Sequence, residues 1–217
     1  LDRPYIASMG IYLFRKDVLA ECLDNDLIDF GHDVIPEAIE KCRVFAYPFH
    51  DVKTRAQSYW RDVGTVDAYF RANLELVYVH PELNLYDDSW PILTDQAQLP
   101  PAKFVFNTEE RRGYATDSMV SGGCLITGAY INHSLLFSNV RVHSYALLED
   151  SVVLPKVEIN RNATIKRAII DRGCKIPEGM QIGVDHEQDR KRGFRVSSGG
   201  VVLVTPTMLG QQTHFMR

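Results

Sequence analysis

Aliphatic residues recur at close to every sixth position between residues 118 and 184, with occasional slips of one residue. This interval fits neither the 3.6-residue period of a helix nor the two-residue period of a strand. Six-residue units build a parallel β-helix, in which each unit is a short strand and a turn, and three units close one coil. We therefore predict about three to four coils, with these residues pointing inward: Ile126, Leu148, Ile159, Ile165, Ile170, Ile176 and Ile182.

A β-sandwich of short strands is the alternative for this region. A sandwich favours turn signals every 8–12 residues. Here small and turn-forming residues return within each six-residue unit, as at Gly122, Gly128, Ser134 and Asn160. The spacing therefore favours the β-helix.

The residues before the repeat alternate between strand and helix patterns. Residues 5–14 and 43–50 are predicted strands, and residues 15–24 and 29–42 are predicted helices. A third helix is predicted to begin after Thr65, a favourable N-cap residue, with its apolar face at 3.6-residue spacing. This face consists of Val66, Tyr69, Phe70, Asn73, Leu74 and Val77.

These elements suggest an incomplete α/β domain, because no Gly-rich phosphate loop accompanies them. We expect this domain over residues 1–83 and a Pro-containing linker over residues 84–117. Residues 118–217 are predicted to hold the β-helix and a closing strand in "GVVLVT". An incomplete domain would leave the segment "ASMGIYLF" and the third helix's apolar face exposed. We therefore expect this chain to form a dimer or tetramer, or residues 1–80 to be substantially disordered.

Composition narrows the functional classes. The net charge of −4 provides no basic field for nucleic acid, and no apolar run is long enough to cross a bilayer. The four cysteines are widely spaced and are expected to be reduced. The histidines show no zinc-binding spacing.

Several motifs, in order along the chain, resemble the C-terminal half of bacterial ADP-glucose pyrophosphorylases (glucose-1-phosphate adenylyltransferases). The segment "WRDVGT" resembles sugar-nucleotide pyrophosphorylases in general, whereas "LPPAKFV" followed by "SGGC" resembles the ADP-glucose branch. The resemblance also includes "ASMGIY", "IDRGCKIPEGMQIG" and "GGVVLVT". It implies the end of a Rossmann-like nucleotidyltransferase domain followed by a left-handed parallel β-helix.

The resemblance implies an enzyme that makes ADP-glucose and pyrophosphate from ATP and glucose 1-phosphate for glycogen synthesis. Members of the family are cytoplasmic, allosteric homotetramers. Their Gly-rich loop and sugar-binding E-K-P motif lie in an N-terminal half that this sequence lacks. We therefore expect this fragment alone to be inactive.

The resemblance also assigns roles to individual residues. Ser8 matches a serine that contacts glucose 1-phosphate, and Asp62 matches a catalytic carboxylate that holds Mg²⁺. A hard oxygen ligand is what Mg²⁺ requires. The alternatives are an ordinary strand hydroxyl for Ser8 and a helix-capping carboxylate for Asp62.

An allosteric site is implied by two further positions. Arg172 matches an arginine that contacts the phosphate of an adenylate inhibitor, and guanidinium geometry suits phosphate. Lys156 stands where the family has a glutamate. This departure from the family pattern argues against adenylate inhibition and leaves open a different phosphorylated or carboxylate effector.

Two other functions stay open from the sequence. A hexapeptide-repeat acyltransferase would need a catalytic histidine, for which His133 or His143 could serve. A non-catalytic assembly or regulatory module could also be built on a β-helix. Neither explains the α/β segment that precedes the repeat.

Overall fold

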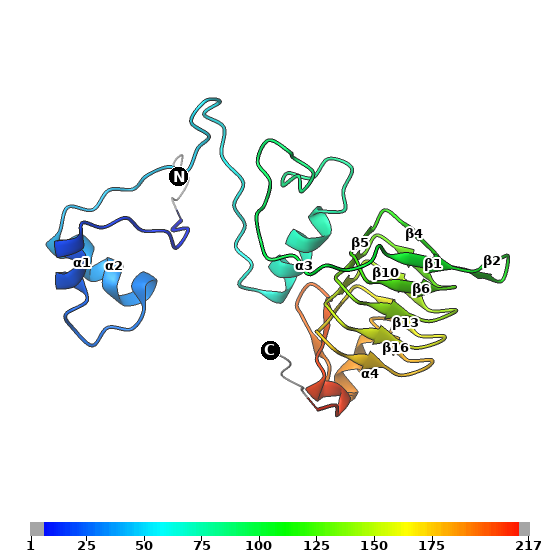
Figure 1. Cartoon of the computed structure of the whole chain (residues 1–217). Helices are drawn as coiled ribbons and strands as arrows, with labels where there is room; N and C mark the ends of the chain where they lie inside the picture. The colour runs from blue at the N-terminus through cyan, green and yellow to red at the C-terminus, as the bar shows by residue number, and fades with distance from the viewer. Residues whose placement is uncertain (1–6, 213–217) are drawn as a thin grey trace. The chain divides into compact units, whose positions relative to one another are not determined.

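The computed structural model describes residues 7–212, whose contacts divide into two compact units at the bond between Trp60 and Arg61. The first unit is small and contains helices α1 (Lys16–Cys22) and α2 (Ile35–Lys41). A π-helical turn, η1 (Phe30–Val34), leads directly into α2, which carries Pro36 in its first turn. The second unit contains helix α3 (Val66–Glu75) and the repeat region (Figure 1).

The two helices predicted in the first unit are confirmed, but the two predicted strands are wrong over the described residues. Residues 7–15 and 43–49 have no regular structure, and His50 makes only an isolated bridge to Gln57. Leu13 and Phe45 are largely exposed. A strand requires a partner to pair its backbone groups, and the described part of this unit offers these segments none. Tyr5 and Ile6, at the start of the first predicted strand, lie outside the described residues.

The repeat region forms a parallel β-helix with three sheets. The first sheet contains β1 (Lys103–Val105), β6 (Leu125–Thr127), β9 (Arg141–Val142), β12 (Glu158–Ile159) and β15 (Lys175–Ile176). The second contains β4 (Tyr114–Thr116), β7 (Tyr130–Asn132), β10 (Leu147–Glu149), β13 (Thr164–Lys166) and β16 (Gln181–Ile182). The third contains β5 (Met119–Val120), β8 (Leu135–Leu136), β11 (Val152–Val153), β14 (Ala168–Ile170), β18 (Val202–Val204) and β17 (Arg195–Val196).

All seven predicted inward positions have no exposed surface, which confirms the repeat reading. Strand register stacks each buried residue on its equivalent in the next coil, as in the column Ile131, Leu148, Ile165 and Ile182. The β-helix also begins earlier than predicted. Strand β1 already pairs in parallel with β6, and β4 with β7, so residues 103–116 extend the first two sheets. The turns here do not follow the six-residue pattern, because the hairpin of β2 (Asn107–Thr108) and β3 (Arg111–Arg112) interrupts them.

Left-handed backbone conformations mark the corners of the coils. One corner has positive φ at Asn139, Lys156 and Gly173, which lie one coil apart. Glycine adopts this conformation without steric cost, and asparagine tolerates it better than most residues. The repeated turn-forming residues in the sequence therefore reflect one tight corner for each strand.

The predicted α3 helix is confirmed, including its N-cap, because Thr65 Oγ1 accepts the N–H of Ala68 at 3.1 Å. Its apolar face lies on the third sheet of the β-helix. Phe70 and Leu74 are 4% and 5% exposed. They form a second core with residues of the β-helix and the segment beside it: Val152, Ile169 and Val201.

This packing corrects one argument for self-association, since the face expected to be exposed is covered within the same unit. The closing strand is also used internally, because β18 pairs with both β14 and β17. By its contacts, α3 belongs with the β-helix, whereas the sequence pattern grouped it with the α/β segment. The predicted domain ranges 1–83, 84–117 and 118–217 stay a prediction.

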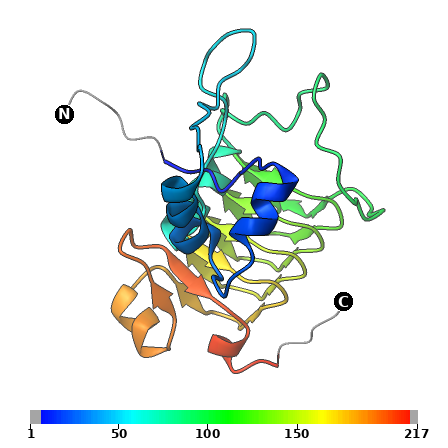
Figure 2. The same cartoon turned by 90° about the vertical axis from the view of Figure 1, so that its left-hand side faces the viewer.

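The lower end of the β-helix is completed by α4 (His186–Lys191), strands β17 and β18, and the 3₁₀ turn η2 (Thr207–Leu209). The strands of successive coils are stacked in a regular series when the molecule is turned (Figure 2). Helix α4 is N-capped by Asp185, whose Oδ1 accepts the N–H groups of Glu187 and Gln188. None of the helices in residues 7–212 is long and apolar enough to cross a membrane.

Candidate functional site

Asp62 lies on the short segment that leads into α3. Its Oδ1 accepts the N–H of Gly64 at 2.9 Å, and its side chain is exposed. Thr65, rather than Asp62, caps the helix. The alternative that Asp62 caps the helix is therefore wrong.

The neighbour of Asp62 ties this segment to the far end of α3. Arg61 Nη2 lies 3.1 Å from Glu75 Oε1, and the same guanidinium pairs with Glu82. Since Glu75 ends α3 and Thr65 caps its beginning, residues 61–65 run back along the helix. The hydrogen bonds that Arg61 donates to Glu75 and Glu82 hold the pKa of its guanidinium above the usual value.

Asp62 is the one carboxylate that the sequence analysis predicts as a Mg²⁺ ligand in this segment. No three His, Cys, Asp or Glu side chains within residues 7–212 gather closely enough to hold a metal by themselves. Mg²⁺ is commonly bound by one or two carboxylates together with substrate phosphates and water. Asp62 fits as one such ligand, and the remaining ligands would have to come from elsewhere.

Ser8 belongs to the other compact unit. It lies in an irregular segment, where its Oγ is 2.9 Å from the hydroxyl of Tyr12 and accepts the N–H of Gly10 at 3.2 Å. Gly10 has a φ of 72°, so the chain turns directly after the serine. The side chain of Ser8 is exposed, as a group that contacts a ligand must be.

The β-helix brings together the two residues predicted to bind an effector. The N–H of Gly173 donates to the carbonyl of Pro155 at 3.0 Å, so Arg172 and Lys156 lie at the same corner of consecutive coils. Both side chains are exposed. We call this place the effector corner, defined by Arg172 and Lys156. Fifteen residues separate the two positions in the sequence, and their proximity follows from the length of one coil.

The two histidines considered for acyl transfer each contact a carboxylate on a neighbouring coil. His133 Nδ1 lies 2.5 Å from Asp150 Oδ1, and its ring stacks on Tyr78. His143 Nε2 lies 3.0 Å from Glu158 Oε1. These two pairs are separate from one another.

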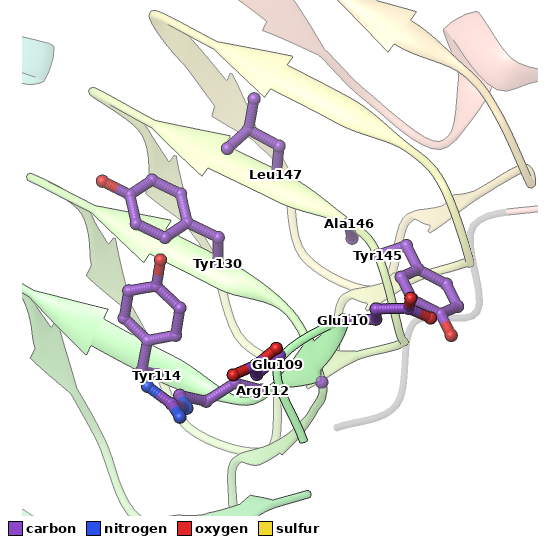
Figure 3. Close-up of a pocket in the computed structure, with 9 residues that line it drawn as sticks. Glu109, Glu110, Arg112, Tyr114, Tyr130, Tyr145, Ala146 and Leu147 are labelled. Carbon is purple, nitrogen blue, oxygen red and sulfur yellow. The ribbon is translucent and has the colours of Figure 1, made fainter. Parts of the chain in front are cut away.

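A shallow hollow of about 240 Å³ lies on the outer face of the second sheet, and the sequence analysis did not identify it (Figure 3). Tyr114 and Tyr130 are register partners on neighbouring coils, with ring centroids 4.8 Å apart. Tyr145, Glu109 and Arg112 also line the hollow. These tyrosines recur in the sequence at about the length of one coil. This spacing indicates a shared face only once the coil length is known from the structure.

Comparison with known proteins places these features in a family. The chain matches the family model "Nucleotidyl transferase" over residues 1–78 and "GlmU-like, C-terminal hexapeptide" over residues 100–204. It is 58% identical, over 97% of its length, to a glucose-1-phosphate adenylyltransferase of Methylococcus capsulatus. The chain belongs to the glucose-1-phosphate adenylyltransferase family. This confirms the family resemblance seen in the motifs.

Other relatives give the same result. An enzyme of this name from Teredinibacter turnerae is 58% identical over 96% of the chain, and one from Shewanella baltica is 57% identical over 94%. These alignments cover 51% and 50% of the two relatives. The chain thus spans about half the length of the curated relatives that it matches.

Proposed function

We propose that this chain is the C-terminal portion of a glucose-1-phosphate adenylyltransferase, an enzyme that makes ADP-glucose and pyrophosphate from ATP and glucose 1-phosphate. The observation that carries the proposal is the identity of 58% across 97% of the chain, which includes both the "WRDVGT" segment and the β-helix. The same reasoning gives a cytoplasmic enzyme of glycogen synthesis that assembles as a homotetramer.

The proposed reaction brings two anions together, because the phosphate of glucose 1-phosphate attacks the α-phosphate of ATP. A bound Mg²⁺ would neutralise part of this charge. Asp62 is the residue proposed to hold the ion, and its exposed carboxylate on an anchored segment suits that role. Ser8 is proposed to position glucose 1-phosphate through its hydroxyl.

The effector corner is proposed to bind a phosphorylated or carboxylate regulator. Arg172 can donate two parallel hydrogen bonds to such a group, and Lys156 adds a second positive charge from the adjacent coil. A glutamate at position 156 would repel a negatively charged ligand, whereas the lysine attracts one. This difference supports an anionic ligand other than the adenylate that the family pattern implies.

The test is ADP-glucose synthesis by the complete protein, measured by pyrophosphate release. We expect Asp62→Asn to reduce turnover by orders of magnitude and raise the Mg²⁺ requirement, because one charged ligand is lost. The exposed Asp95 serves as the matched control, and Asp95→Asn should leave both values unchanged. Unaltered kinetics in Asp62→Asn would exclude the metal assignment, and an inactive wild-type protein would exclude the function.

Ser8→Ala tests the sugar-phosphate contact separately. We expect the Michaelis constant for glucose 1-phosphate to rise, with a smaller effect on the constant for ATP, because one hydrogen bond to the sugar phosphate is removed. Such a bond contributes about 0.5–1.5 kcal/mol. An equal rise for both substrates would contradict the proposed contact.

A further inference from the structure

A carboxylate at the start of α3 holds a turn that lies 130 residues further along the chain. Asp67 Oδ1 accepts the hydroxyl of Ser197 at 2.6 Å. Its Oδ2 accepts the hydroxyl of Ser198 at 3.3 Å and the N–H of Gly199 at 3.2 Å. We call this arrangement of Asp67, Ser197, Ser198 and Gly199 the Asp67 latch. Hydrogen bonds from Ser197, Gly199 and Ser198 lower the pKa of the Asp67 carboxyl.

The turn is shaped closely to this carboxylate. A Cβ atom on Gly199 would lie 2.5 Å from Asp67 Oδ1, so a side chain at this position would push the carboxylate away. Arg167 supports the turn from the opposite side by donating from Nε to the carbonyl of Gly199 at 3.1 Å. The guanidinium of Arg167 also lies 5.7 Å from the ring centre of Phe70 on α3. The contact is therefore polar at the start of α3 and apolar along its buried face.

The latch is connected to the segment that carries Asp62. Only Gly64 and the N-cap Thr65 separate the Asp62–Val63 pair from the first residue of α3. At the other end of the helix, Arg61 pairs with Glu75. Because residues 61–65 are fixed to both ends of α3, a shift of the helix on the β-helix would move the Asp62 carboxylate with it.

The latch is also connected to the effector corner. The turn at residues 197–200 joins β17 to β18, and β18 pairs with β14 through Ala168↔Val202 and Ile170↔Val204. Strand β14 ends two residues before Arg172, and the N–H of Asp171 donates to the carbonyl of Val204 at 2.9 Å. A continuous series of backbone pairs therefore joins the corner to the turn that Asp67 holds.

We propose that Asp67 is a positioning residue that sets the Asp62 carboxylate by fixing the start of α3 on the turn at residues 197–200. This inference rests on the proposed function and deepens it by naming a residue that positions the proposed metal ligand.

The first experiment measures the latch without reference to catalysis. Amide hydrogen exchange is followed in this chain and in Asp67→Asn, with Asp87→Asn as the matched control. Asp87 Oδ1 also accepts a serine hydroxyl, from Ser89 at 2.6 Å, but without a contact to α3. We expect faster exchange in residues 61–70 of Asp67→Asn alone, with the coil at residues 147–149 unchanged. Equal exchange in residues 61–70 of all three proteins would overturn the proposal.

The second experiment uses the complete protein and the Mg²⁺ concentration that gives half-maximal ADP-glucose synthesis. We expect Asp67→Asn to raise this concentration severalfold, because the segment that carries the Asp62 carboxylate is held less firmly. The Michaelis constant for glucose 1-phosphate should change little. In the Asp62→Asn background, Asp67→Asn should add almost nothing, because the ligand that it positions is absent.

The outcomes separate the two proposals. An unchanged Mg²⁺ requirement in Asp67→Asn, or an effect that is fully additive with Asp62→Asn, would overturn the positioning role while the enzyme remains active. A wild-type protein without synthesis would overturn the proposed function. In that case faster exchange in residues 61–70 of Asp67→Asn would still uphold the latch.

Discussion

Truncating one inward residue tests the β-helix core most directly. Ile165 has no exposed surface and stacks between Leu148 and Ile182 of the adjacent coils. Ile165→Ala removes three carbon atoms, at about 0.8 kcal/mol each in transfer free energy. The space left behind adds a further cost, because stacked coils on both sides limit collapse. We expect a total loss of about 3–4 kcal/mol, within the usual range for such changes.

The assay is thermal and urea unfolding, followed by far-ultraviolet circular dichroism. In a chain of this size, a loss of 3–4 kcal/mol lowers the midpoint by roughly 6–16 °C. Ile92→Ala is the matched control, since Ile92 is 55% exposed in a segment without regular structure. Its effect should stay within about 0.5 kcal/mol.

The comparison of Ile165→Ala with Ile92→Ala can refute the prediction. If Ile165→Ala and Ile92→Ala differ by less than about 1 kcal/mol, the stacked column does not carry the stability that its burial implies. Ile165→Asp places a carboxylate at the same position, where no polar partner can satisfy it, and should prevent the module from folding.

Three further predictions follow from other positions. Gly183→Ala should destabilise the protein strongly, because its Cβ would lie 1.8 Å from the Lys166 carbonyl oxygen. Gly179→Ala is the control: it has a similar positive φ but lies in open space, so it should cost only the backbone strain. The thermal unfolding midpoints of the two variants are compared. Burial raises the pKa of the Cys174 thiol to about 12, so iodoacetamide at pH 8 should modify the half-buried Cys42 first, and mass spectrometry of peptides checks the order. Because the pKa of Asp67 is lowered in the folded state, its contribution to stability is present above the ordinary carboxyl pKa and is lost as the pH falls through the folded value. The stability difference between wild type and Asp67→Asn should therefore shrink as the pH falls below the ordinary carboxyl pKa, and a difference that stays constant through the acid range would refute the assignment.

The N-terminal unit exposes several apolar side chains. They include Ile11, Leu13 and Phe45. The covered face of α3 removes part of the argument for self-association, but these side chains still favour it. Light scattering of the chain at micromolar concentration measures this directly, and a monomer across that range would contradict the expectation.

The sequence by itself determined the β-helix, the inward columns and α3. These features depend on local rules: a period of six for the coils, 3.6 for the helix, and Thr65 as a cap. Each inward aliphatic residue packs on its equivalent in the next coil, so the spacing of these residues in the sequence directly predicts the contacts between coils. The motifs along the chain, from "ASMGIY" with Ser8 through "WRDVGT" with Asp62 to "LPPAKFV" and "SGGC", likewise indicated the family and the candidate residues.

Tertiary structure alone decided which distant residues meet. The predicted strands 5–14 and 43–50 have β-type composition, but their described residues, from residue 7 onward, join no sheet. Composition cannot supply the missing hydrogen-bond partners. Helix α3 could have packed on either unit, and only the fold showed that Phe70 and Leu74 lie against the β-helix. The meeting of Arg172 with Lys156 depends on the length of a coil, and that of Asp67 with Ser197 depends on where the closing hairpin ends. Such long-range contacts produce no periodic pattern in the sequence. The residues between the two partners can vary in number and type without changing the six-residue or the helical spacing.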